Sequence, residues 1–135
     1  MQNHTPFPGV GHLAITVSDL KVSVPWYAAL FGSQPVLDEY VVPGDFHHTV
    51  FAFESGQLFG LHQHTAGGAG EFDERRAGLD HVAFAVSSRD ELQVWEARLD
   101  ELGLKHGGIV DAHYGSGLSF RDPDNVALEF FAPPA

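Results

Sequence analysis

Two histidines at the starts of two similar strand patterns are the first residues of this sequence that suggest chemistry. His12 opens the segment 12–17 and His81 opens the segment 81–86, an offset of 81 − 12 = 69 positions. After each histidine, bulky and small side chains alternate, which is typical of a β-strand with one packed face. The small residues on the other face leave room beside each imidazole. The recurrence indicates two copies of one structural unit.

Two further side chains with metal-binding chemistry lie near the ends of the two copies. An offset of 129 − 62 = 67 aligns His62 with Glu129. Glu129 interrupts the apolar run 126–131, where an uncompensated carboxylate would be costly to bury. Imidazole and carboxylate suit a divalent first-row metal such as Ni, Mn, Co, Fe or Zn. The predicted ligands are His12, His62, His81 and Glu129.

The elements that must position these side chains follow from hydrophobic periodicity and turn residues. Strands are expected at 11–18, 34–42, 47–54, 58–64, 80–87, 105–112, 117–121 and 126–131, and helices at 21–31 and 90–102. Ser87 and Ser88 offer N-caps for the second helix, and Gly32 and Gly103 follow the helices as stops. Each half of the chain therefore reads as a βαβββ module of an α+β fold.

The length of 135 residues fits one domain, residues 1–135. Module 1 is expected at about 9–65 and module 2 at about 79–132, with a linker at about 66–78 that is glycine-rich and then charged. The linker is long enough either for one chain to close on itself or for two chains to exchange halves.

Strand alternation also selects candidate walls for a cleft between the modules. The two matching faces carry His47, Thr49, Phe51 and Phe53, and Tyr114, Ser116, Leu118 and Phe120. His47 and Tyr114 align at the offset 114 − 47 = 67, which makes both candidates for proton transfer or substrate binding. The alternative for each is a surface-loop or core position. Separate expectations are helix-to-sheet packing for Trp26, Trp95 and Leu99, and a solvated or ion-paired state for Arg121.

The composition excludes several classes of function. The chain has no cysteine, which rules out disulfides, thiolate ligands and thiol catalysis. Seven Lys and Arg against eighteen Asp and Glu give a net charge of −11, which would repel nucleic acid. No apolar run approaches the roughly 20 residues that cross a bilayer, and residues 1–8 lack the pattern of a secretory signal. We expect a soluble, cytoplasmic protein with no membrane or nucleic-acid partner.

Three segments resemble the vicinal oxygen chelate superfamily, which includes glyoxalase I, methylmalonyl-CoA epimerase, extradiol dioxygenases, fosfomycin-resistance transferases and metal-free proteins that sequester bleomycin. They are Gly11–Val17, Asp80–Val86 and Phe120–Phe130. The resemblance implies a curved mixed sheet around a metal cleft and a homodimer. It also implies three ligand positions, at His12, His81 and Glu129. His62 falls where glyoxalase-like members carry a fourth ligand, usually Glu.

The leading functional hypothesis is an enzyme whose metal binds two neighbouring oxygens of a small substrate, while Glu129, Tyr114 or His47 moves a proton. Four ligands favour glyoxalase-like isomerase, lyase or epimerase chemistry. If His62 stays off the metal, the two histidines and Glu129 form a triad that activates dioxygen on Fe(II), which favours a ring-cleaving dioxygenase. The non-enzymatic alternative sequesters an antibiotic or another planar molecule. Scarce basic residues disfavour a fosfomycin-type thiol transferase.

Overall fold

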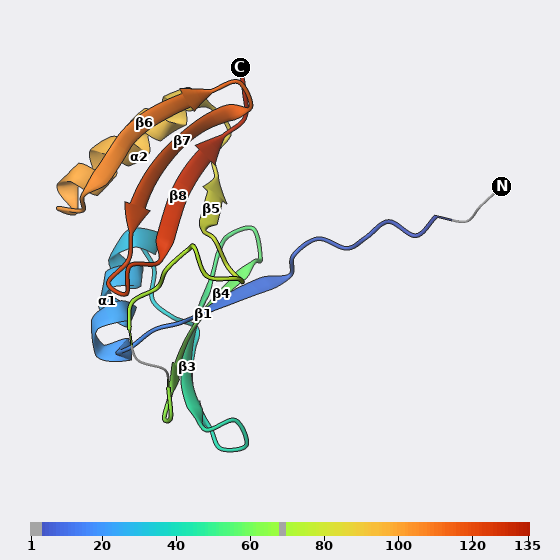
Figure 1. Ribbon diagram of the computed structural model, residues 1–135, viewed down its shortest axis with the longest axis vertical. Coiled ribbons are helices and arrows are strands. Elements are labelled where there is room, and N and C mark those ends of the chain that lie inside the picture. Colours follow the sequence, from blue (N-terminus) through green and yellow to red (C-terminus); the bar gives the residue numbers. More distant parts are fainter. Residues whose placement is uncertain (1–3, 68–69) are drawn as a thin grey trace.

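The computed structural model describes residues 4–67 and 70–135, which form two βαβββ modules in tandem. The first contains β1 (His12–Thr16), α1 (Leu20–Phe31), β2 (Leu37–Val41), β3 (Phe46–Ala52) and β4 (Leu58–His64). The second contains β5 (Val82–Ala85), α2 (Arg89–Glu101), β6 (His106–Ala112), β7 (Gly115–Arg121) and β8 (Ala127–Ala132) (Figure 1). The predicted α+β fold class is confirmed. The predicted linker includes positions 68 and 69, which lie outside the described residues.

Each module builds its own four-stranded mixed sheet. The strand orders are β1-β4-β3-β2 and β5-β8-β7-β6. The first strand of each module runs parallel to the last, and the remaining neighbours are antiparallel. In the described part of the chain the predicted curved mixed sheet consists of two four-stranded sheets, because β1 and β5 are edge strands that do not pair with each other.

Side-chain caps explain where the two helices begin. The Asp19 carboxylate accepts a hydrogen bond from the backbone N–H of Lys21 at the start of α1, and the Ser88 hydroxyl does the same for Glu91 at the start of α2. α1 ends at Gly32, whose φ of 67° is the left-handed conformation that glycine adopts without strain. These caps define the ends of the helices, which lie close in sequence to the strands before and after them.

The core lies between each helix and one face of its sheet. In the first module Phe51, Phe59 and Leu61 are buried on this face, and in the second module Leu118 and Leu128 are buried in the equivalent way. The three predicted packing residues confirm this layer: Leu99 is fully buried, Trp26 packs against the core, and Trp95 stacks on Phe130 at a ring-centroid distance of 4.3 Å. Within residues 4–67 and 70–135, no helix covers the opposite face of either sheet (Figure 1).

The turn between β7 and β8 joins the two modules. The Tyr27 hydroxyl on α1 donates a hydrogen bond of 2.7 Å to the Asp122 carboxylate in this turn, and the N–H of Ser18 donates one of 3.0 Å to Asp124. Tyr27 and Asp122 are both buried, and burial raises the pKa of each side chain. The turn predicted at 122–125 is thus a contact between modules as well as a hairpin.

The chain leaves an unusually large surface exposed. Its accessible area is 8978 Å², whereas a compact monomer of this mass is expected to expose about 6,900 Å². Part of the excess comes from the extended N-terminal arm, where Phe7 is 96% exposed (Figure 1). The uncovered sheet faces add to it. No helix among the described residues combines the length and apolar character needed to span a bilayer.

Candidate metal centre

The uncovered face of each sheet carries the predicted metal ligands. We call it the open face, and it is defined by Ala14 and Gly60 in the first sheet and by Ala83 and Glu129 in the second. On the second open face, His81 directly precedes β5 and Glu129 projects from the neighbouring strand β8. The alternation of strand side chains puts these residues opposite the buried core layer.

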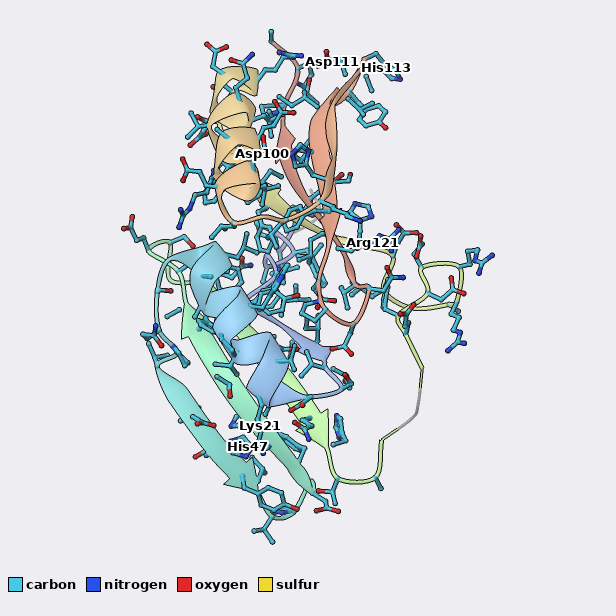
Figure 2. All side chains as sticks on the ribbon, turned by 90° about the vertical axis from the view of Figure 1, so that its left-hand side faces the viewer. Lys21, His47, Asp100, Asp111, His113 and Arg121 are labelled. Carbon is cyan, nitrogen blue, oxygen red and sulfur yellow. The ribbon has the colours of Figure 1, made fainter. Side chains whose placement is uncertain are left out.

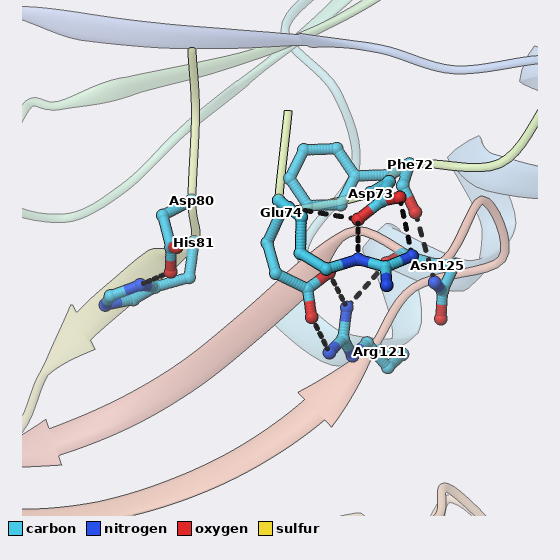
Figure 3. A network of polar contacts seen from close by, with 8 residues as sticks. Phe72, Asp73, Glu74, Asp80, His81, Arg121 and Asn125 are labelled. Carbon is cyan, nitrogen blue, oxygen red and sulfur yellow. Dashed lines mark hydrogen bonds and ion pairs between the residues drawn. The ribbon is translucent and has the colours of Figure 1, made fainter. Parts of the chain in front are cut away.

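His81 and Glu129 come together, and a neighbouring carboxylate orients the imidazole. His81 Nε2 lies 3.3 Å from Glu129 Oε1. On the other side of the ring, Nδ1 donates to Asp80 Oδ1 at 2.7 Å (Figure 3). A carboxylate bonded to one imidazole nitrogen fixes the tautomer that leaves the other free to bind a metal. The donor set and the supporting carboxylate therefore fit a divalent cation.

A glycine keeps space open beside the second oxygen of Glu129. A Cβ placed on Gly117 would lie 3.3 Å from Glu129 Oε2, closer than most side-chain contacts. Glu129 itself is partly shielded, with 21% of its side chain exposed. His81 also borders a hollow of about 540 Å³ whose walls include Leu13, Phe59 and Leu79. The size of this hollow suits a small molecule.

The strand register corrects the sequence alignment of the last strands. Ala14 pairs with Gly60 on β4, and the equivalent Ala83 pairs with Glu129 on β8. The offset is 69 for both partners (83 − 14 and 129 − 60), the same as for the two histidines. Gly60 is therefore the equivalent of Glu129. His62 is equivalent to Phe131, which pairs with Ala85. The offset of 67 was wrong by two residues, a slip that keeps every side chain on its own face.

His62 lies among aromatic rings on the first open face. Its ring stacks on Phe46 at 4.6 Å and meets His48 edge to face at 5.3 Å. His48 Nε2 contacts Glu39 Oε1 at 3.0 Å. Burial, with the neighbouring His48 and His64, lowers the pKa of the His62 imidazole. The ring is thus held in place and favours its neutral form.

One copy of the chain does not gather the predicted ligands into a metal site. His12 is exposed on β1 and pairs with Leu58, four positions along the strand from the row that holds Thr16 and His62. Over residues 4–67 and 70–135, no three His, Asp or Glu side chains lie close enough to hold one metal ion. The structure therefore brings together His81 and Glu129 and leaves His12 and His62 apart from them.

The two predicted proton-transfer residues lie on different faces. His47 shares its face with Thr49 and Phe51, both buried beneath α1, so this face belongs to the core and not to a cleft wall. Its ring contacts Asp38 in a groove beside Lys21, at the start of α1 (Figure 2). His47 is therefore on the opposite side of the sheet from His12.

Tyr114 lies in the turn before β7 and is 65% exposed. Its ring stacks on Phe131 at 6.3 Å with an interplanar angle of 14°. Because Phe131 is on the second open face, Tyr114 borders that face. The sequence pattern predicts that Tyr114 shares a face with Ser116, Leu118 and Phe120. This prediction is wrong, because those three residues are buried and Tyr114 is exposed.

The charged end of the linker forms a contact that the sequence does not reveal. Arg121 donates to both oxygens of Glu74, at 2.8 and 3.1 Å (Figure 3). The expectation that Arg121 is ion-paired is confirmed, and this pair lowers the pKa of Glu74 to about 2. The segment 71–76 contains five charged residues, and the sequence alone does not show which of them pairs with Arg121.

Comparisons with known proteins match this fold over nearly the whole chain. A solved glyoxylase/bleomycin resistance protein/dioxygenase domain from Frankia sp. EAN1pec is 32% identical, with a TM-score of 0.84, and the match covers 96% of this chain and 94% of that one. The FosX fosfomycin resistance protein of Listeria monocytogenes, solved with Mn(II) and sulfate, shares the fold at 19% identity over 96% and 95% of the two chains, with a TM-score of 0.67.

Two curated relatives carry names for different activities. The metallothiol transferase FosB of Bacillus licheniformis is 27% identical over 129 residues, 90% of this chain and 73% of that protein. The "Putative ring-cleaving dioxygenase MhqA" of Bacillus subtilis is 33% identical over 54 residues, 40% of this chain, and the match spans only 17% of that protein's length. A model of the Glyoxalase/Bleomycin resistance protein/Dioxygenase superfamily matches residues 9–130. The chain belongs to this superfamily.

Proposed function

We propose that this protein is a metal-dependent enzyme that chelates two neighbouring oxygens of a small substrate through a three-ligand centre. The ligands are His12, His81 and Glu129, and ring-cleaving dioxygenase chemistry is the activity they support best. The observation that carries the proposal is Gly60 at the position equivalent to Glu129, because glycine has no side chain to supply a fourth ligand. Two histidines and one carboxylate leave coordination positions open for substrate and dioxygen.

A second copy of the chain completes the centre in this proposal. His12 of one protomer joins His81 and Glu129 of the other when the two open faces meet. Three observations support the exchange: the ligands stay apart within one chain, both open faces lack a cover, and the accessible area exceeds that of a compact monomer. Small apolar residues such as Ala14, Ala83 and Ala85 are exposed on these faces and become buried in such a dimer.

The residues around the centre have distinct roles in the proposed reaction. A bound divalent metal would supply a Lewis acid for the two substrate oxygens and, as Fe(II), affinity for dioxygen. Asp80 holds the His81 ring so that Nε2 faces Glu129. Gly117 keeps side-chain atoms away from the free oxygen of Glu129. Tyr114 and Phe131 offer a stacked aromatic wall for a planar substrate.

His62 is the proposed proton-transfer residue. A Cβ on Gly60 would lie 3.7 Å from His62 Nε2, so the imidazole edge borders the space that the missing fourth ligand would occupy. Phe46 and His48 hold the ring in this position. A neutral imidazole beside chelated oxygens can accept the proton of a substrate hydroxyl. This role replaces the metal-ligand role that the sequence alignment had suggested for His62.

Thiol transfer to a phosphonate is less well supported. A phosphonate needs free cationic side chains, and Arg121 is the only Lys or Arg within the described strands. Both Glu74 oxygens already accept hydrogen bonds from its guanidinium group. The aromatic rings of the open faces suit a planar aromatic diol better than a small anion.

The test loads metal-free protein with Fe(II) under argon, then adds catechol and air-saturated buffer. We expect oxygen uptake with a new absorbance from the opened ring, and neither signal after chelation of the metal. The His62→Gln variant should keep its iron and lose most of the turnover. Stoichiometric iron without oxygen uptake contradicts dioxygenase activity. Conversion of a hemithioacetal by the Ni(II)-loaded protein would instead favour the isomerase alternative.

A further inference from the structure

Hydrogen bonds and an ion pair hold the charged linker segment 72–76 against the second module. The N–H of Phe72 donates to the carbonyl of Asp124 at 2.9 Å, and the side-chain amide of Asn125 donates to the carbonyl of Phe72 at 3.1 Å. Two positions further on, Glu74 accepts both hydrogen bonds from Arg121 (Figure 3). The segment therefore has a defined place beside the second sheet, although it contains neither strand nor helix.

Arg121, which forms the ion pair with Glu74, is at the same level across the strands as the proposed metal ligand His81. Arg121 pairs with Ala127, and the β5–β8 register, extended by one residue from Val82, puts His81 on the other side of Ala127. Adjacent strands are about 4.8 Å apart, so the Arg121 backbone is about 10 Å from that of His81 across a single alanine. The ion pair and the proposed metal ligand thus occupy one edge of the second open face.

The chain between these two points is short. Only five residues separate Glu74 from Asp80, and one of them, Gly78, has a φ of 132° that other residues rarely adopt. At one end the ion pair holds Glu74, and at the other the Asp80 carboxylate holds the His81 ring before β5 begins. The two anchored points, Glu74 and Asp80, are therefore joined by one short segment of backbone.

We propose that the Arg121–Glu74 ion pair is a latch that positions His81 for metal binding. Arg121 and Glu74 act as positioning residues, through the 75–80 segment and without touching the metal. This inference rests on the proposed function, because it takes His81 as a ligand. Both side chains are partly exposed, at 43% and 34%, and exposed ion pairs contribute little to global stability. Metal affinity is where the latch should show its effect, since supporting residues of this kind typically change it by about 10- to 100-fold.

The chain offers a matched control in the same module. Arg89 donates to both oxygens of Asp111, at 2.7 and 3.0 Å, and its side chain is 46% exposed. Asp111 is on the edge strand β6, away from the 72–80 segment. Loss of this pair removes a bidentate contact of the same type and leaves the approach to His81 unchanged.

The experiment measures Co(II) affinity by visible absorption in the full-length protein. Arg121→Gln and Glu74→Gln should each weaken Co(II) binding about tenfold, while Arg89→Gln should leave it unchanged. The double reversal Glu74→Arg with Arg121→Glu should recover most of the affinity, because it restores the pair with opposite polarity. Circular dichroism of each variant checks that the fold is kept, and Glu74→Gln removes the pair without altering any strand.

The outcomes separate the latch from the metal centre itself. If His81→Ala loses Co(II) while Glu74→Gln and Arg121→Gln bind it like the wild type, the latch is wrong and the proposed centre stands. If Arg89→Gln weakens binding as much as Arg121→Gln, the effect is a general loss of charge and the latch is again overturned. If His81→Ala binds Co(II) as tightly as the wild type, both the centre and the latch are wrong.

Discussion

The two modules share one backbone plan and differ in what they present on their open faces. A constant offset of 69 relates β1 to β5, β3 to β7 and β4 to β8. The second module adds Glu129 to its histidine, whereas the first has Gly60 at the equivalent position and gathers His48, His62 and His64 nearby. In the proposed function, the duplicated scaffold keeps its core while the second module supplies most of the metal ligands and the first supplies the proton-transfer residue.

Removal of the carboxylate that only the second module has should give the largest effect. We expect Glu129→Ala to lose stoichiometric metal, because one of three ligands disappears and the coordination set becomes incomplete. His62→Ala should retain the metal. Elemental analysis of both purified variants measures this difference. A metal loss in His62→Ala equal to that in Glu129→Ala would restore the four-ligand alternative and contradict the assignment of Gly60.

Equivalent substitutions in the buried cores of the two modules should destabilise the protein to a similar extent. Phe51 and Phe120 are equivalent residues and are 0% and 3% exposed. Replacement of either by alanine should lower the free energy of unfolding by about 3–5 kcal/mol, through lost burial and the cavity left behind. Urea denaturation at equilibrium measures both values. A large cost at one site with almost none at the other would show that the two cores are not equivalent.

The contact between modules should have a smaller and asymmetric effect. Tyr27→Phe removes the donor to the buried Asp122 carboxylate and should cost about 1–3 kcal/mol, since that acceptor loses a partner. Tyr27 is equivalent to Glu96 in the second module, and Asp122 is equivalent to Phe53 in the first. Glu96 and Phe53 cannot form the same hydrogen bond. Tyr40→Phe serves as the control, because Tyr40 is 50% exposed. A larger loss of Tm in Tyr40→Phe than in Tyr27→Phe would contradict this account.

The smallest effect should come from an ion pair that only the second module has. Arg89 lowers the pKa of Asp111 from 3.8 to about 2, whereas the equivalent positions in the first module are Leu20 and Tyr40, which cannot form an ion pair. A lowered carboxyl pKa adds stability above the unfolded value, and this stability is lost as the pH falls through the folded value. The difference in Tm between wild type and Arg89→Gln should therefore shrink between pH 3.8 and about 2. A difference that stays constant over this range would exclude the charge as its cause.

The sequence alone was enough to predict the repeat and the order of the elements, because both depend on local periodicity. The assignment of His12, His81 and Glu129 as metal ligands stays a prediction. The sequence alignment placed His62 opposite Glu129 because Phe51 and Phe53 are two positions apart, and a slip of two residues preserves the alternation of faces. The hydrogen-bond register of the strands was needed to choose between the offsets of 67 and 69. The Arg121–Glu74 contact was also beyond prediction, since several acidic residues near the linker could have paired with the same arginine.

A mixture of two inactive variants tests the shared centre most directly. His12→Ala and His81→Ala should each fail to bind Co(II) alone. When the two are unfolded together and refolded, a mixed dimer should regain one intact site, formed by His12 of the His81→Ala protomer with His81 and Glu129 of the His12→Ala protomer. Recovered Co(II) absorption in the mixed dimer is the predicted result. A mixture that stays as metal-free as its components would show that the ligands do not come from two chains.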